Sequence, residues 1–426
     1  MNSFIIRGDI CYSADKNHLI TKENSYLICE NGVCAGVFDM IPDRYADLPV
    51  HDHSGMLVMP GMVDLHIHAP QYAYRGLGMD RELLDWLNTY AFPEESKYGD
   101  LVYADNAYTI FANAIRSSAT TRLCVFGTLH RTATELLMDK LENIGVVSYV
   151  GKVNMDRNSP DTLREASAQT SLADTERFIK ETQEKYKNTY PIITPRFIPS
   201  CTDELTKGLG MLSKQYHIPV QTHLSENPGE VAWVKELCPW AENYGEAYNR
   251  FGLFGKPEKA VMAHCVYSDE KEIARMKENG VFIAHCPASN TNVASGIAPV
   301  RKYLEADMNI GLGSDVACGH SESMFTAMVD ALQVSRLYWR LVDQGQKPLN
   351  VGEVFYMATK GGGAFFGKVG SFEEGYEFDA VVIDDSLLPH PQELTLQERL
   401  ERSIYLAGDV KALKAKYCRG IEIMRN

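Results

Sequence analysis

Eight short apolar runs, separated by longer polar stretches, constrain the fold of this chain more than any other feature. Each run is rich in Val, Ile and Phe and lacks strict polar alternation, which is typical of parallel strands buried on both faces. The polar stretches between them are long enough for a helix, as at 174–186 and 269–279. The runs are Met59–Leu65, Thr121–Phe126, Val146–Val153, Pro191–Phe197, Ile218–His223, Ala260–His264, Val281–His285 and Ile310–Asp315.

Eight strand-then-helix units in succession predict an α/β fold, a distorted (β/α)8 barrel of the TIM type. We place this barrel at residues 59–365. A doubly wound open sheet would show the same alternation along the chain, so it stays open as the alternative.

The two ends of the chain differ from the barrel pattern. Residues 1–58 carry the dipeptide Asn31-Gly32 between two apolar runs, which is a signal for a β-hairpin. Residues 366–426 also contain strand-like apolar runs. We therefore expect the two ends to pair into a small β-sandwich domain beside the barrel.

Charge and cysteine usage exclude several classes of protein. Acidic residues outnumber basic ones, 56 against 42, so the net charge is −14 and a phosphate backbone would be repelled. No apolar stretch is long enough for a membrane span. The 10 cysteines are dispersed without a Cys-x-x-Cys pair, which is typical of a reduced, cytoplasmic protein. We expect neither a nucleic acid nor a membrane as partner.

Histidines and an aspartate stand where the predicted strands end. His66 and His68 point to one face of their strand, because residues i and i+2 share a face. His223 and His264 end the fifth and sixth runs, and Asp315 ends the eighth. Strand ends of a closed barrel converge on one axis. We therefore expect these five side chains to meet.

Three imidazoles and one carboxylate make a suitable site for Zn²⁺ or Fe²⁺ with an open position for water. Metal binding lowers the pKa of water from 15.7 to about 7 and so generates hydroxide at neutral pH. For an isolated His-x-His motif, a hydrogen-bonded pair in a core is the alternative. The recurrence of His and Asp at other strand ends argues against that alternative.

The set His66-x-His68, His223, His264 and Asp315 resembles the amidohydrolase superfamily, in its mononuclear aminohydrolase branch. Further motifs narrow the resemblance to the family of guanine deaminases, and it extends from about residue 57 to the C-terminus. Gln71 and the pair Arg196-Phe197 are its discriminating elements. The motifs are APQY at 69–72, LDWLNTYAFP at 84–93, TPRF at 194–197, HLSEN at 223–227, AHCPASN at 284–290 and GLGSDVA at 311–317.

The resemblance implies an activity and a cofactor. It implies hydrolysis of guanine to xanthine and ammonia by a metal-activated water. It also implies one metal ion per chain, zinc with iron as the alternative, and a homodimer. The implied ligands are His66, His68, His223 and Asp315.

Deamination also needs groups that move protons. Glu226 lies three residues after His223, and a carboxyl there suits a proton shuttle to ring N3 and to the departing ammonia. Asp315 can take the proton of the attacking water. His264 would hydrogen-bond the intermediate, a role that the sequence does not separate from that of a ligand.

Recognition of a purine needs donors and acceptors at the ring edges. Arg196 presents a planar fork suited to the carbonyl O6, and Gln71 can both donate and accept. Trp86 is a candidate wall, although it equally fits the apolar stripe of a core helix. We expect the substrate to be bound by Gln71, Arg196, Phe197, His68, His223 and Trp86.

Two other functions stay open. Another aminohydrolase or halohydrolase of the superfamily, acting on an adenine-like ring, a pterin or a triazine, would keep the metal set without requiring Arg196 and Gln71. A non-catalytic barrel would have lost ligands or the shuttle carboxylate, and all are present. Segment 156–175 does not match the resemblance and is either a lid or an ordinary solvated loop.

Overall fold

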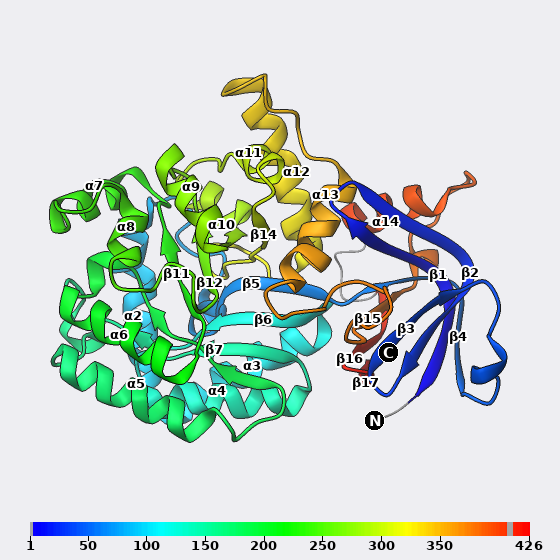
Figure 1. Cartoon of the computed structure of the whole chain (residues 1–426), viewed down its shortest axis with the longest axis horizontal. Coiled ribbons are helices and arrows are strands. Elements are labelled where there is room, and N and C mark those ends of the chain that lie inside the picture. Colours follow the sequence, from blue (N-terminus) through cyan, green and yellow to red (C-terminus); the bar gives the residue numbers. More distant parts are fainter. Residues whose placement is uncertain (1–2, 407–411) are drawn as a thin grey trace.

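The computed structural model describes residues 3–406 and 412–426. A barrel built from the middle of the chain lies beside a sheet that gathers both chain ends (Figure 1). The ranges predicted for the terminal domain, 1–58 and 366–426, include residues 1–2 and 407–411, which lie outside the described part.

Parallel strands form the wall of the barrel. Strands β5, β6, β7 and β9 pair in that order, and β11 to β14 form a second arc. A bridge between Ile193 and Val220 joins the arcs, and β14 lies against β5, so the ring is closed. The predicted barrel is confirmed, and the open doubly wound sheet is excluded. The strands are β5 (Met62–His68), β6 (Thr120–Phe126), β7 (Val147–Gly151), β8 (Val153–Asn154), β9 (Thr189–Pro191), β10 (Thr194–Pro195), β11 (Val220–Leu224), β12 (Ala260–His264), β13 (Phe282–His285) and β14 (Asn309–Leu312).

The third and fourth strand positions are broken, and this is where the barrel is distorted. Each consists of a longer piece and a two-residue piece, β7 with β8 and β9 with β10, and the short pieces pair with each other. Pro191 and Pro195 lie in the fourth position and have no backbone N–H for a ladder. The continuous strand predicted over 191–197 is therefore interrupted.

Helices cover the outside of the barrel (Figure 1). Their ends follow local signals: the helix predicted over 269–279 begins after Asp269, whose side chain accepts from the Glu272 N–H, and ends before Gly280 at φ 67°. Among the described helices, none has both the length and the apolar character needed to cross a membrane. The α-helices are α1 (Leu83–Trp86), α2 (Phe92–Glu95), α3 (Leu101–Ser117), α4 (Arg131–Ile144), α5 (Ala168–Thr182), α6 (Asp203–Tyr216), α7 (Pro228–Leu237), α8 (Tyr244–Asn249), α9 (Glu270–Asn279), α10 (Pro287–Asn292), α11 (Val300–Glu305), α12 (Met324–Leu341), α13 (Val351–Tyr356) and α14 (Leu396–Leu406).

The two chain ends pair with each other beside the barrel, as predicted, but their described strands form one continuous sheet and not the two packed sheets expected of a β-sandwich. The strands of this sheet follow the order β17-β16-β15-β4-β1-β2-β3, so a C-terminal strand pairs directly with an N-terminal one. The predicted hairpin is β2–β3, with Asn31 at φ 52° and Gly32 at φ 84°, the positive values that a tight two-residue turn requires. The strands are β1 (Phe4–Asp15), β2 (His18–Glu30), β3 (Val33–Phe38), β4 (Val50–Pro60), β15 (Ala380–Ile383), β16 (Leu413–Cys418) and β17 (Ile421–Arg425).

One apolar core unites the N- and C-terminal strands. The ring of Phe4 lies 5.2 Å from that of Phe378 and 5.3 Å from that of Tyr417, all three buried. Strand β4 ends at Pro60, and β5 begins at Met62. The sheet is therefore tied to the barrel at the point where the first barrel strand starts. The exact domain boundaries at residues 58 and 366 stay predictions.

A buried ion pair connects the barrel to the sheet domain. Arg122 on β6 donates from Nε to Asp379 Oδ2 at 2.5 Å and from Nη2 to Oδ1 at 2.9 Å. Asp379 precedes β15, and neither side chain is more than 2% exposed. Nη2 also reaches Glu377 at 3.0 Å, but that carboxylate is 36% exposed. The same cation therefore has one buried partner and one solvated partner.

We expect Asp379→Asn to lower the free energy of unfolding by about 3–5 kcal/mol, because it leaves the Arg122 charge buried without its close partner. Glu377→Gln is the matched control, and its effect should stay within about 1 kcal/mol because water screens that pair. Urea unfolding followed by circular dichroism measures both. Equal losses in the two variants would contradict this assignment.

Candidate active site

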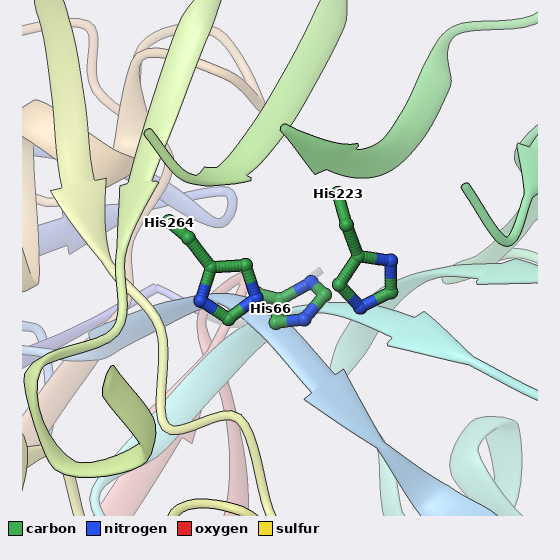
Figure 2. A group of neighbouring side chains, drawn as sticks. All are labelled: His66, His223 and His264. Carbon is green, nitrogen blue, oxygen red and sulfur yellow. The ribbon is translucent and has the colours of Figure 1, made fainter. Parts of the chain in front are cut away.

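Four predicted side chains converge at the carboxyl ends of the barrel strands. His68 Nε2 lies 3.3 Å from His66 Nε2 and 3.2 Å from His223 Nε2. Asp315 Oδ1 lies 3.2 Å from His66 Nε2 and 3.5 Å from His68 Nε2. Figure 2 shows the rings of His66, His223 and His264 turned toward one another from different strands. The structure thus gathers ligand atoms from both arcs of the barrel around one point.

Hydrogen bonds behind the cluster orient its members. His223 Nδ1 donates to the backbone carbonyl of Arg196 at 2.6 Å, which leaves Nε2 free to face the cluster. The buried carboxylate of Asp64 accepts from the His66 N–H at 3.1 Å and from the Ser314 N–H at 3.0 Å. Asp64 therefore locks the strand end that carries His66 to the turn that carries Asp315.

The chemistry of this cluster fits a divalent metal ion. Burial, and then the neighbouring imidazoles, hold the pKa values of His66, His68 and His223 well below the ordinary value, so the rings are neutral. Neutral imidazole is the ligating form, and nitrogen lone pairs 3.2–3.3 Å apart repel unless a cation or a proton lies between them. Groups of His and Asp in this region have ligand atoms within 4.8 Å of one another. Three nitrogens and a carboxylate oxygen suit zinc or iron.

His264 lies next to the cluster with one ring nitrogen free. Its Nδ1 contacts Asn290 Oδ1 at 2.8 Å, whereas its buried Nε2 has no hydrogen-bond partner among the described residues. That Nε2 lies 3.4 Å from Glu226 Oε2 and 3.8 Å from Asp315 Oδ2. The amide oxygen of Asn290 only accepts, so Nδ1 carries the proton of a neutral ring. Nε2 could then accept from a bound group or ligate a metal, and it could donate only from a ring protonated on both nitrogens.

Glu226 lies just beyond β11, buried and aimed at the same space. Burial, and then the charge of Asp315, raise the pKa of Glu226 well above its ordinary value. Ser295 Oγ donates to Glu226 Oε1 at 3.0 Å, and the Glu226 N–H donates to Glu230 Oε2 at 3.0 Å. A carboxyl that is held in place and readily protonated is what proton transfer needs.

The backbone is strained at three of these strand ends. Ser225, His264 and Asp315 have φ values of 49°, 76° and 47°, a region that residues other than glycine rarely adopt. Such conformations cost of order 1–3 kcal/mol each and cluster at functional sites. We infer that these unfavourable backbone conformations are retained because they direct side chains into the site.

A cavity opens onto the cluster. Of the residues predicted for the site, all line it except His66, which lies behind His68 and His223. Trp86 is both wall and core, because it lines the cavity, is fully buried and donates from Nε1 to the Leu77 carbonyl at 3.1 Å. Segment 156–175 contributes no described residue to the lining, and its Glu165 is buried beside Lys152. From Ala168 on, the segment is the start of α5 and not a loop, so the helix predicted over 174–186 begins six residues earlier, at 168, and ends at Thr182.

Arg196 and Gln71 lie on the same wall of the cavity, and both contact Glu95. Arg196 donates to Glu95 from Nη1 at 2.5 Å and from Nη2 at 3.0 Å, and Gln71 Nε2 donates at 2.8 Å. Burial disfavours the charged form of Arg196, but Glu95 outweighs it, so the pKa of the guanidinium is raised. The guanidinium also lies 4.9 Å from the ring centre of Phe92. Glu95 and Phe92 both belong to α2.

Glu95, Ser295 and Glu230 contribute to the site but were not predicted from the sequence. A signal existed for Glu95: it lies three residues after Phe92, so the two share one face of a helix, and a charged residue on an apolar face requires a partner. Glu230 is the third residue of α7 and forms a capping box with Asn227, a pattern readable as a helix start but not as a wall of the cavity. Ser295 lies in an irregular segment and had no such signal.

A sequence model of the Amidohydrolase family matches residues 57–408. The chain belongs to the amidohydrolase family. The guanine deaminase of Dictyostelium discoideum is 39% identical over 382 residues, which cover 88% of this chain and 84% of that protein. The guanine deaminase of Escherichia coli (strain K12) is 36% identical, with 83% and 78% covered. A crystal structure of a guanine deaminase from C. acetobutylicum, with bound guanine in the active site, is 47% identical with a TM-score of 0.96, and 99% of this chain and 100% of that chain are covered.

We expect this amidohydrolase to purify with one divalent metal ion per chain, and His66→Ala to lose it. Loss of a residue that only hydrogen-bonds to a metal ligand typically weakens metal binding by roughly 10–100-fold. Loss of a ligand itself should weaken it more. His130→Ala, at a histidine beyond the end of β6 and outside the cluster, is the control and should keep its metal. Elemental analysis decides. Full metal content in the His66 variant would contradict this prediction.

Proposed function

We propose that this chain catalyses the hydrolytic deamination of guanine to xanthine and ammonia. The observation that carries the proposal is the single cavity in which the His/Asp cluster and Glu226 lie together with Arg196 and Gln71. Relatives named guanine deaminase, at 36–39% identity over most of the chain, support it. So does the similar structure of a guanine deaminase with guanine in its active site.

The metal would be zinc, one ion per chain, with iron as the alternative. His66, His68, His223 and Asp315 would hold it through their converging nitrogen and oxygen atoms. When bound, such an ion lowers the pKa of a coordinated water from 15.7 to about 7.

Protons move through the carboxylates of the chain. Asp315 accepts one proton from the attacking water, and Glu226 gives its own proton to ring N3. Glu226 then takes the remaining proton of the hydroxyl that has added at C2 and delivers it to the amino group, so the oxygen becomes a carbonyl. The proton on Asp315 passes back to Glu226, which restores both carboxyl groups. A C–O bond forms at C2 of guanine, the C2–N bond breaks, and the nitrogen leaves as ammonia. His264, in the form protonated on both ring nitrogens, donates from Nδ1 to Asn290 and from Nε2 to the oxygen that has added at C2. The raised pKa of Glu226, which results from its burial, favours the protonated form that this role needs.

The far wall of the cavity would bind the purine. Arg196 and Gln71 face the carbonyl at C6, and Phe197 and Trp86 enclose the flat ring, which also contacts His68 and His223. An aminohydrolase for an adenine-like ring, which has no carbonyl at C6, would have no use for a fixed guanidinium at this place. A homodimer and a cytoplasmic location stay predictions.

The test of this function is ammonia release from guanine beside adenine, cytosine and 8-oxoguanine. We expect guanine to be hydrolysed and adenine to be nearly inert, because the amino group at C6 of adenine would set N–H donors against the donors of Arg196. Sites built to hydrogen-bond one group reject the analogue without it by about 10⁴-fold or more. Comparable kcat/KM values for guanine and adenine would move the assignment to another aminohydrolase.

We expect Glu226→Gln to lower kcat on guanine by about 10²-fold or more, because an amide of nearly the same shape cannot accept and pass on a proton. Metal content should be unchanged, since Glu226 is not among the proposed ligands. Steady-state kinetics and elemental analysis on the same preparation measure both. A variant with the wild-type rate would refute the shuttle role.

A further inference from the structure

A buried carboxylate stands behind the wall proposed to bind the purine. Glu95, at the end of α2, is 1% exposed, and its partners Arg196 and Gln71 are 3% and 2% exposed. Glu95 is absent from the cavity lining, whereas Arg196 and Gln71 are part of it. Glu95 therefore touches the groups that would touch the substrate, and not the substrate itself.

The hydrogen bonds of Glu95 determine how Arg196 faces the cavity. The two oxygens accept from different terminal nitrogens of the guanidinium, Nη1 to Oε2 and Nη2 to Oε1. This bidentate contact fixes the plane and the direction of the fork. A guanidinium has five N–H donors, so three remain for other acceptors. Phe92 beneath the fork adds a second restraint from the same helix.

Glu95 also determines how Gln71 faces the cavity. Gln71 Nε2 donates to Glu95 Oε1 at 2.8 Å, while Gln71 Oε1 accepts from the Ala317 N–H at 3.2 Å. A flipped amide would set its oxygen against the carboxylate and its NH₂ against the N–H, so only one orientation is satisfied. The amide keeps one N–H and one lone pair for a ligand.

We propose that Glu95 is the positioning residue for purine specificity. It holds Arg196 and Gln71 in the one arrangement that reads the amide edge of a purine, namely the C6 carbonyl and the hydrogen on N1. Arg196 supplies donors to the carbonyl, and Gln71 supplies the remaining N–H and lone pair. The inference rests on the proposed function, because it takes the cavity to bind a purine in this orientation.

The charge of Glu95 matters as much as its shape. Without a carboxylate beside it, Arg196 would be a buried cation lacking its bidentate partner, and its fork would be free to turn. Glu95→Gln keeps the size of the side chain but replaces one acceptor oxygen by an NH₂ group, which cannot accept from Arg196. We therefore expect the Glu95→Gln variant to lose the hydrogen bonds to the amide edge, while the rest of the cavity is unchanged.

Two ligands isolate this effect from catalysis. Hypoxanthine has the amide edge of guanine and purine lacks it, and neither carries the amino group that is removed. Calorimetry on zinc-loaded protein should show hypoxanthine bound at least about tenfold more tightly than purine by the wild type, the size expected for hydrogen bonds to a charged group. In Glu95→Gln this ratio should fall to within about threefold of one, with purine affinity and metal content little changed.

Matched variants guard the interpretation. Glu94→Gln makes the same change one residue earlier, where the side chain contacts Lys97 and Tyr103 instead, and it should keep the wild-type ratio. Glu95→Asp keeps the negative charge beside Arg196, so the variant should fold. Its carboxylate is one methylene farther from Arg196 and Gln71, so the preference for hypoxanthine over purine should still fall. Arg196→Lys loses the fork and should abolish the preference.

Three results would overturn the inference. The first is that both Glu95 variants keep the wild-type ratio of hypoxanthine to purine affinity. The second is that the variants lose affinity for both ligands in proportion, as a structural defect would cause. The third is that the wild type shows no preference for hypoxanthine. A wild type that prefers hypoxanthine but releases no ammonia from guanine contradicts the proposed function alone, since the ratio still reports on Glu95.

Discussion

The constraint on which the rest of this structure depends is the approach of two neutral imidazoles to a third: His66 Nε2 and His223 Nε2 lie 3.3 and 3.2 Å from His68 Nε2. Such nitrogens repel unless something positive lies between them, and burial has removed the protons that would otherwise do so. The barrel supplies the geometry because its strand ends face one axis. Asp64 joins the ends of the first and last strands, and its hydrogen bonds to His66 and Ser314 hold the two sides of the cluster in register.

Arg196 links the two halves of the cavity. Its backbone carbonyl orients the imidazole of His223. Its side chain is held by Glu95, which lies three residues after Phe92 on α2, behind the wall of the cavity. Arg196 therefore orients His223, a proposed metal ligand, through its backbone and presents its guanidinium to the proposed purine site through its side chain. Arg196 directly follows the second piece of the fourth strand, which is short because Pro191 and Pro195 have no backbone N–H for the ladder.

Most of the fold could be predicted, because strands buried on both faces appear in the sequence as apolar runs such as Ile218–His223. The residues of the cluster could be predicted because they are the polar residues at the ends of these runs. Pro191 and Pro195 indicate in the sequence that the strand is interrupted. Where it is interrupted depends on which backbone hydrogen bonds the neighbouring strands form, and the sequence does not show these. Glu95 was missed because its partners belong to other segments of the chain: Gln71 lies in a 3-10 helix after β5, and Arg196 directly follows β10. Ser295 was missed because irregular backbone carries no periodicity from which direction can be read.

The central claim is that one metal ion, held by the His/Asp cluster, makes this chain hydrolyse guanine. Its most direct test is a titration of metal-free protein with Zn²⁺ while ammonia release from guanine is recorded. The account predicts negligible release without metal, a linear rise, and a break at one equivalent per chain, with xanthine formed in equal amount to ammonia. Full activity of the metal-free protein, or activity that rises only beyond a second equivalent, would contradict it.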